Sequence, residues 1–296
     1  MKRSKMPAGG TVNSSLIRRP IQRQFWIFLL PTFVCFCLGF LWPFIQGIYL
    51  SFNKFTTTSH AEWTGLRNYE KAFSDAGFLH AFWYTALVAV VALVLINVLA
   101  FAVAYGLTRK IRGANLYRGV FFVPNLIGGI VLGYIWQMMF SRILPVSMVN
   151  VTSYGFWGLI VVLCWQQVGY MMIIYVAGLT AVPEDMLEAA RIDGANGWKT
   201  LWHITLPTVM PSITICTFLT LTNSFKLYDQ NMVLTNGAPK VSGVFTTEML
   251  ALNIAKTFDN AKLRGTAQAK AVIFFIVVAA ISLIQLTLTR RKEVQQ

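Results

Sequence analysis

Six long apolar runs constrain this chain more than any other feature of its sequence. Each is long enough to cross a bilayer as a helix, which takes ~20 residues. The runs cover residues 25–52, 81–107, 119–140, 154–182, 206–228 and 271–289. Backbone groups in lipid must be hydrogen-bonded within the structure that spans it, and the alternating pattern of a membrane barrel is absent. The predicted fold class is therefore an all-α membrane protein with six transmembrane helices.

The composition supports this interpretation and excludes others. Hydrophobic residues make up 56% of the chain and charged residues only 12%, whereas a soluble domain carries ~25% charge. The net charge of +14 comes from Lys and Arg beside the apolar runs, not from a separate basic domain. Such residues are typical of the cytoplasmic membrane surface rather than of nucleic-acid binding.

The polar ends and loops predict the orientation. Segment 1–24 is basic, and the apolar run after it is too long for a cleavable signal peptide. With segment 1–24 inside, the short cytoplasmic loops are richer in Lys and Arg than the external ones. We expect one membrane domain over 25–290, with segment 1–24 and the tail 291–296 both cytoplasmic.

The longest polar interruption on the cytoplasmic side covers residues 183–207. Pro183 suits the first helical position, and Gly194 suits a helix stop because glycine readily takes the left-handed conformation. Asn196 can cap a second short helix that leads to Pro207 and the next apolar run. The segment is predicted to form a helix, a tight turn and a second helix.

Residues in this hairpin resemble the EAA loop of ABC importer permeases. The matching positions are Glu188, Ala189, Ala190, Asp193, Gly194, Ile204, Leu206 and Pro207. The resemblance implies the type I ABC importer permease fold, in which this hairpin couples the membrane helices to a separate ATPase subunit. Glu188 is then expected to make a polar contact with the ATPase. Residue spacing alone leaves open an ordinary amphipathic interfacial hairpin.

Flanking segments resemble the maltose-type carbohydrate branch of the same family. Pro31 and Pro43 fit its first helix, Gly65 to Tyr69 its first external segment, and 223–239 the end of its fifth helix and the loop after it. A glycine-rich run usually precedes the proline of that loop, but here Asn236 and Ala238 flank a single glycine. The flanking similarities therefore indicate carbohydrate less specifically than the EAA loop indicates an ABC importer.

The resemblance implies a permease subunit for sugar or polyol uptake in a bacterial or archaeal cytoplasmic (inner) membrane. The expected partners are a second permease, two ATPase subunits and an external solute-binding protein, which would meet segments 53–80 and 229–270. No cofactor is expected in this chain, and ATP and Mg would bind the ATPase subunits.

The chain is not expected to be an enzyme. The nearest approach to a phosphate-binding loop has Trp198 between Gly197 and Lys199, and no strand precedes it. No nucleophile with a base, no metal-binding spacing and no carboxylate within a predicted span is present. A permease for a non-sugar solute remains an alternative, as does a secondary carrier that works alone, although no internal repeat supports the latter.

Polar and aromatic residues in the fourth and fifth spans are candidates for the transport pathway. Amides hydrogen-bond hydroxyl groups and rings cover the apolar faces of a polyol. The predicted pathway residues are Gln166, Tyr170, Asn223, Lys226 and Tyr228. Helix–helix hydrogen bonding is the competing explanation for the amides, and snorkelling to the outer interface, with Asp229 as partner, is the competing explanation for Lys226.

Two pairs of small residues predict close helix packing. Gly129 with Gly133 lies in the third span, and Ala102 with Gly106 lies in the second. Either pair could pack within the chain or against a second permease.

Overall fold

The computed structural model describes residues 25, 27, 29–57, 60–109, 111–145, 148, 150–240 and 246–290, and every structural statement below refers to them. The predicted cytoplasmic segments 1–24 and 291–296 lie outside this set. The chain divides into two compact units, Met1–Tyr49 and Leu50–Gln296, which are described separately.

The described part of the first unit is helical. A helix over Leu29–Ser51 is long and apolar enough to cross a membrane, and its last two residues, Leu50 and Ser51, are assigned to the second unit. It contains a π-helical stretch, η1 (Cys37–Leu41), followed by α2 (Trp42–Ser51). The described residues of the predicted first span are therefore helical as far as Ser51.

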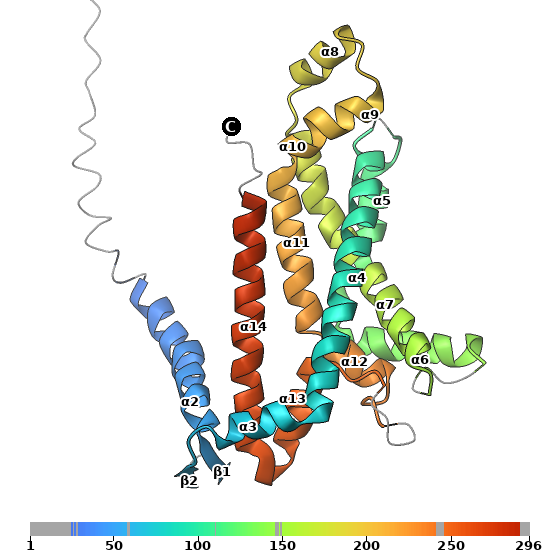
Figure 1. Ribbon diagram of the computed structural model, residues 1–296. Helices are drawn as coiled ribbons and strands as arrows, with labels where there is room; N and C mark the ends of the chain where they lie inside the picture. The colour runs from blue at the N-terminus through green and yellow to red at the C-terminus, as the bar shows by residue number, and fades with distance from the viewer. Residues whose placement is uncertain are drawn as a thin grey trace, which may run out of the picture. The chain divides into compact units, whose positions relative to one another are not determined.

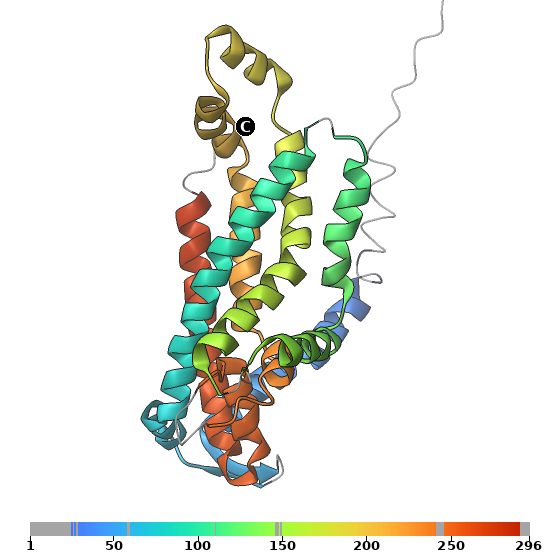
Figure 2. The same cartoon turned by 90° about the vertical axis from the view of Figure 1, so that its right-hand side faces the viewer.

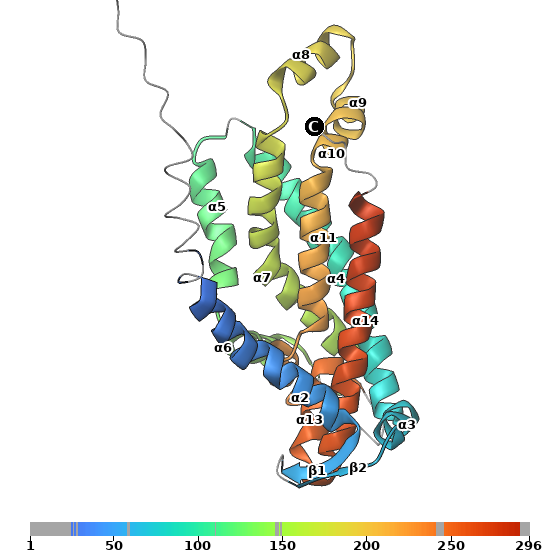
Figure 3. The same ribbon diagram turned by 90° about the vertical axis from the view of Figure 1, so that its left-hand side faces the viewer.

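Four long helices lie side by side in the second unit. They are α4 (Ala76–Leu107), α7 (Thr152–Thr180), α11 (Met210–Phe225) and α14 (Arg264–Arg290). Helix α4 packs against α7 and α11, and α11 also packs against α14 (Figures 1 and 3). We call the end of this unit that carries α8 and α9 the hairpin end, and the opposite end the far end (Figure 2).

A buried stripe on α4, three of whose four residues are alanine, brings α4 and α7 close together. Ala92, Ile96, Ala100 and Ala104 recur every fourth residue, so they share one face of the helix, and all four are fully buried. They belong to the main hydrophobic core together with residues of α7 such as Leu163 and Met171. Small side chains let two helix backbones approach without a gap, as is usual in membrane bundles.

Among the described residues, four to six segments could span a membrane. Four helices are long and apolar enough by themselves: Leu29–Ser51, Ala76–Leu107, Thr152–Thr180 and Ala261–Arg290. Two further pairs of helices qualify only if each bent pair is one span. These pairs correspond to the third and fifth predicted spans, neither of which forms one straight helix.

The third predicted span bends by 98° between Ala114–Leu126 and Gly129–Ile143. Helix α5 (Ala114–Phe122) tightens into the 3-10 turn η2 (Val123–Leu126), and α6 (Gly129–Ile143) follows. Ile127 and Gly128 are extended between them. Pro124 provides no N–H for a continuing helix, so the ladder of hydrogen bonds is interrupted next to the bend.

The fifth predicted span bends by 70° between Gly197–Thr208 and Met210–Phe225. The first segment comprises α9 (Gly197–Thr200), the π-helical η3 (Leu201–Thr205) and α10 (Leu206–Thr208). Pro211 lies in the first turn of α11 and disfavours the helical conformation at the residue before it. The upright part of the fifth span is therefore α11 alone.

The far end carries several elements that the apolar runs did not predict. An antiparallel hairpin pairs β1 (Asn53–Thr57) with β2 (His60–Trp63), with Asn53 opposite Trp63. Helix α3 (Arg67–Ser74) precedes α4, while α13 (Leu250–Asp259) and the 3-10 turn η4 (Ala261–Leu263) precede α14. Asn68 donates to the carbonyl oxygens of Ser51 and Asn53, each at 2.9 Å, and so ties α3 to the start of the hairpin.

One charge lies elsewhere than the sequence analysis placed it. The sequence analysis placed Lys270 at the end of the external segment 229–270. Lys270 instead lies within α14 and is 1% exposed. It is held by Asp75 Oδ2 at 2.6 Å, Asn253 Oδ1 at 2.9 Å and Thr257 Oγ1 at 2.8 Å. A buried ammonium persists in such a place because all three of its N–H donors have partners.

Candidate functional site

The hairpin end carries a helix–turn–helix at the predicted position. Helix α8 (Glu184–Ile192) begins one residue after Pro183, which caps the helix instead of occupying its first position. Gly194 has φ +72°, and its N–H bonds the Arg191 carbonyl at 3.1 Å. The Ala195 N–H bonds the Ala190 carbonyl at 2.9 Å. These two bonds form a Schellman motif, the helix stop that favours glycine.

The second helix of the hairpin begins at the predicted cap. Asn196 Oδ1 accepts the backbone N–H of Lys199 at 2.9 Å, which satisfies one of the free donors at the start of α9. Ile204 lies in η3, while Leu206 and Pro207 lie in α10. The motif residues therefore form one continuous structure from α8 to the start of α11.

Helix α8 extends beyond the long helices (Figures 1 and 2). The hairpin also exposes apolar side chains. Ile192 is 87% exposed, Trp198 in α9 is 67% exposed and Met186 is 44% exposed. Ala190 is the only buried residue of α8. Glu188, Ala189 and Asp193 lie at or near the surface, where another protein can reach them.

A polar pocket of about 300 Å³ lies where the bend of the third span meets the end of α11. Its walls come from η2, the middle of α7, the end of α11 and the start of α12 (Asp229–Leu234). The lining residues are Asn125, Gln166, Gln167, Asn223, Lys226, Leu227, Tyr228, Asp229 and Gln230. Five of these nine are amides, which both donate and accept hydrogen bonds.

Hydrogen bonds hold some of these amides and leave another free. Gln230 Nε2 donates to Gln166 Oε1 at 2.8 Å, and Gln166 Nε2 donates to the Ile127 carbonyl at 3.4 Å. Gln167 is 6% exposed, yet its Oε1 has no hydrogen-bond partner. A buried acceptor without a partner is costly, so this oxygen can gain from a hydroxyl group that enters the pocket.

The pocket brings together four of the five predicted pathway residues. Gln166, Asn223, Lys226 and Tyr228 line it, whereas Tyr170 does not and packs against the main core instead. The expected pairing of Lys226 with Asp229 is not formed, and neither side chain makes an ion pair with a described residue. Both charges are therefore available at the pocket wall.

Sequence reasoning missed four polar residues of the pocket. Gln167 was not among the predicted pathway residues, and Asp229 was considered only as a partner for Lys226. Asn125 and Gln230 were not singled out, because Asn125 reaches the pocket at the bend of the third span and Gln230 reaches it from α12, which follows the end of α11. The pair Pro124-Asn125 was the available signal, since a proline within an apolar run marks a break beside which a polar side chain can be used. Among the described residues, no group of three or more His, Cys, Asp or Glu side chains could hold a metal ion.

Comparison with known proteins identifies the class of protein that this fold defines. Residues 97–294 match the family model described as the binding-protein-dependent transport system inner membrane component. The chain belongs to this family of ABC importer permeases, and it is a multi-pass membrane protein.

Two curated relatives share most of the chain. The probable starch degradation products transport system permease protein AmyD of Thermoanaerobacterium thermosulfurigenes is 40% identical over 282 residues, which cover 92% of this chain and 95% of AmyD. The multiple sugar-binding transport system permease protein MsmF of Streptococcus mutans is 30% identical, with 94% and 99% covered. These relatives place the chain among the carbohydrate permeases of the family.

A solved structure shares the fold. A bacterial ABC transporter involved in the import of the acidic polysaccharide alginate matches with a TM-score of 0.76 and 18% identity, over 93% of this chain and 99% of that one.

Proposed function

We propose that this chain is one of two permease subunits of a sugar importer and that its hairpin transmits the work of two separate ATPase subunits. The observation that carries this proposal is hairpin α8–α9, which exposes the apolar side chains of Met186, Ile192 and Trp198. ATP and Mg would bind the ATPase subunits, and this chain would supply no catalytic group. An external solute-binding protein would deliver the sugar to the far end.

Coupling would follow from rigid-body motion. Closure of the ATPase subunits on ATP would displace α8, and the Schellman turn at Gly194 would pass that displacement to α9, η3 and α11. Glu188 and Asp193 would make polar contacts with the ATPase, while Ala189 and Ala190 would allow a close fit. With the hairpin end in the cytoplasm, both chain termini are cytoplasmic as well.

The polar pocket would bind the sugar as it passes. The unpartnered Gln167 Oε1 would accept a hydroxyl hydrogen, and Asn223, Tyr228 and Lys226 would offer donors. The carbohydrate relatives support a sugar over an amino acid or a phosphate ion.

The hairpin is tested by copurification. The tagged full chain, solubilised from its natural host, is expected to bring down an ATP-binding subunit, and Gly194→Trp is expected to lose it while still inserting in the membrane. Recovery of the chain with no ATP-binding subunit under conditions that retain a second permease would contradict the proposal.

The pocket is tested by uptake of radiolabelled maltotriose, a starch degradation product. Gln167→Ala and Asn223→Ala are each expected to raise the KM for uptake by about tenfold, the factor for one lost hydrogen bond of ~1.4 kcal/mol. Gln285→Ala is the matched control, because Gln285 also has a buried Oε1 without a partner but lies in α14 outside the pocket. Competition of uptake by an amino acid or phosphate, and not by sugars, would favour the alternative of a non-sugar solute.

A further inference from the structure

The turn after α12 has an unfavourable backbone conformation. Asn236, Gly237 and Ala238 have φ values of 49°, 73° and 45°, so three successive residues are left-handed. Glycine takes this conformation freely and asparagine tolerates it, but the Cβ of alanine is crowded by the following carbonyl oxygen. The residue that needs outside support is therefore Ala238.

Support for this turn comes from both sides. Asn236 Oδ1 accepts Gln137 Nε2 of α6 at 2.6 Å. The Ala238 carbonyl accepts Lys256 Nζ of α13 at 3.0 Å, and Ala238 is 3% exposed. Lys256 thus holds Ala238 through the carbonyl oxygen of Ala238, although 18 positions of sequence separate the two residues.

Lys256 is itself fixed by a chain of polar contacts at the far end. Its Nζ lies 3.6 Å from Glu248 Oε2, and Glu248 is 6% exposed. Glu248 Oε1 accepts Asn253 Nδ2 at 3.1 Å, and Asn253 Oδ1 accepts Lys270 Nζ at 2.9 Å. The contacts continue to Asp75 at the start of α4. The chain ties the strained turn to α13, α14 and α4.

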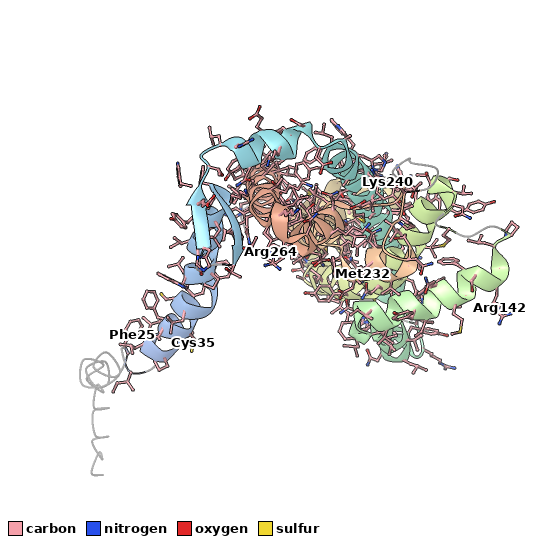
Figure 4. The ribbon with its side chains drawn as sticks, turned by 90° about the horizontal axis from the view of Figure 1, so that it is seen from below. Phe25, Cys35, Arg142, Met232, Lys240 and Arg264 are labelled. Carbon is pink, nitrogen blue, oxygen red and sulfur yellow. The ribbon has the colours of Figure 1, made fainter. Side chains whose placement is uncertain are left out.

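The other end of α12 forms the wall of the polar pocket. Asp229 and Gln230 line the pocket, and Gln230 bonds Gln166. Helix α12 has six residues, so only ~9 Å separates its two ends. The turn at Asn236–Ala238 is therefore close enough to the pocket wall for a change in the turn to reach it through α12. Figure 4 looks onto the far end, where Met232 of α12 and Lys240, just after the turn, are labelled.

We propose that Lys256 is a positioning residue for the transport pathway. It stabilises the left-handed backbone conformation of Ala238, and it thereby keeps α12 in the orientation that closes the polar pocket around Gln167. The role of the pocket in sugar transport rests on the proposed function above. The positioning itself does not, and it can be measured without any sugar.

The test is the rate at which a cysteine at position 167 reacts with a small water-soluble maleimide, in membranes from the natural host that contain the full chain and its partners. Cys35, Cys37, Cys164 and Cys216 are first replaced by alanine, and Gln167→Cys provides the reporter. Lys256→Met is expected to raise the labelling rate about fivefold to tenfold. Lys262→Met, which removes an exposed lysine of η4 with no described ion pair, is the matched control and is expected to leave the rate unchanged.

A second substitution separates positioning from general stability. Ala238→Gly removes the crowding at the turn, so the turn no longer needs Lys256. Lys256→Met with Ala238→Gly is therefore expected to return the labelling rate to that of the reporter alone. A purely structural loss of the Lys256–Glu248 ion pair would not be rescued by glycine at 238.

Two results would overturn the proposal: a labelling rate unchanged by Lys256→Met, or a raised rate that Ala238→Gly fails to lower. If Lys256→Met does not reach the membrane, Glu248→Gln replaces it. This variant keeps an amide oxygen for Asn253 but removes the charge that holds Lys256, and it must also raise the rate and respond to Ala238→Gly. The outcome of the labelling test does not depend on whether the pocket variants lose maltotriose uptake, so the two proposals can fail separately.

Discussion

Lys270 Nζ lies 2.6 Å from Asp75 Oδ2, and this contact joins the start of α14 to the start of α4 across 195 positions of sequence. The two partners differ in environment, because the Lys270 side chain is 1% exposed and the Asp75 side chain 38%. Asp75 also accepts the Gly77 N–H at 2.8 Å as the cap of α4. The pair therefore contributes both to helix capping and to the charge balance of the far end.

Replacing Asp75 and replacing Lys270 should lower the free energy of unfolding by different amounts. Asp75→Asn keeps a cap for α4 but leaves the buried ammonium of Lys270 without a counter-ion, so a loss of ~3–5 kcal/mol in unfolding free energy is expected. Lys270→Met leaves a carboxylate that water can still reach, and a loss of roughly 1–2 kcal/mol is expected. Thermal unfolding of the solubilised protein, followed by tryptophan fluorescence, measures both. Asp259→Asn at the exposed end of α13 is the control, within ~0.5 kcal/mol of the unsubstituted chain. Equal losses for the two variants would contradict this account.

The same pair predicts how stability depends on pH. Burial alone would raise the pKa of Asp75, but the hydrogen bond and charge of Lys270 and the backbone N–H groups of Gly77 and Phe78 outweigh it, so the pKa lies below its ordinary value of 3.8. The folded-state pKa is thus lower than the unfolded one, and the stabilisation is fully present above the unfolded value and lost as pH falls through the folded one. The Tm difference between the unsubstituted chain and Asp75→Asn should be constant from about pH 5 to 8 and shrink below about pH 4. A difference that already declines between pH 7 and 6 would assign the effect to another group.

Local signals in the sequence predicted the hairpin end well. Gly194 and Asn196 act through their own backbone and the next few residues, so the stop of α8 and the cap of α9 could be predicted without knowledge of the rest of the fold. The six apolar runs likewise predicted helices, because lipid demands hydrogen bonding within each segment. They did not predict the bends of 98° and 70°, although Pro124 and Pro211 mark both places.

Residues that act across the fold were harder to predict. Lys270 appeared to be a loop lysine because α14 begins before its apolar run, and its partner Asp75 lies far away in the sequence. Gln167 and Gln230 enter the pocket from different helices, and Tyr170, one turn from Gln166, points into the core instead. Periodicity cannot tell which face of an apolar helix meets a polar pocket, since that depends on the partners of the helix.

Gly133 should tolerate no side chain, whereas Gly106 should. A Cβ on Gly133 would lie 2.9 Å from Val233 Cβ of α12, and one on Gly106 would meet nothing within 4 Å. Gly129 and Gly133 therefore pack against α12 of the same chain. The sequence had left open whether they pack within the chain or against a second permease. Gly133→Ala is expected to cost ~1–3 kcal/mol through overpacking, while Gly106→Ala should gain up to ~1 kcal/mol in helix propensity. Thermal unfolding compares the two directly, because both change the same residue type within a helix. Destabilisation by Gly106→Ala to the same extent would show that the glycine contacts do not decide the outcome.

Gly194 and Gly197 form a second matched pair, three residues apart in the hairpin. A Cβ on either would meet nothing within 4 Å, but only Gly194 has a positive φ, at +72°. Gly194→Ala should therefore disfavour the turn by ~1–2 kcal/mol from backbone conformation alone, while Gly197→Ala should leave the turn unchanged. If the hairpin couples transport to ATP hydrolysis, Gly194→Ala lowers maltotriose uptake about fivefold to tenfold. Its membrane insertion and the labelling rate of the Gln167→Cys reporter stay the same, because the pocket lies away from the hairpin. Gly197→Ala keeps full uptake. Equal uptake by the two variants would mean that the bend at Gly194 transmits no force, and a Schellman turn at this position would then serve only to end α8.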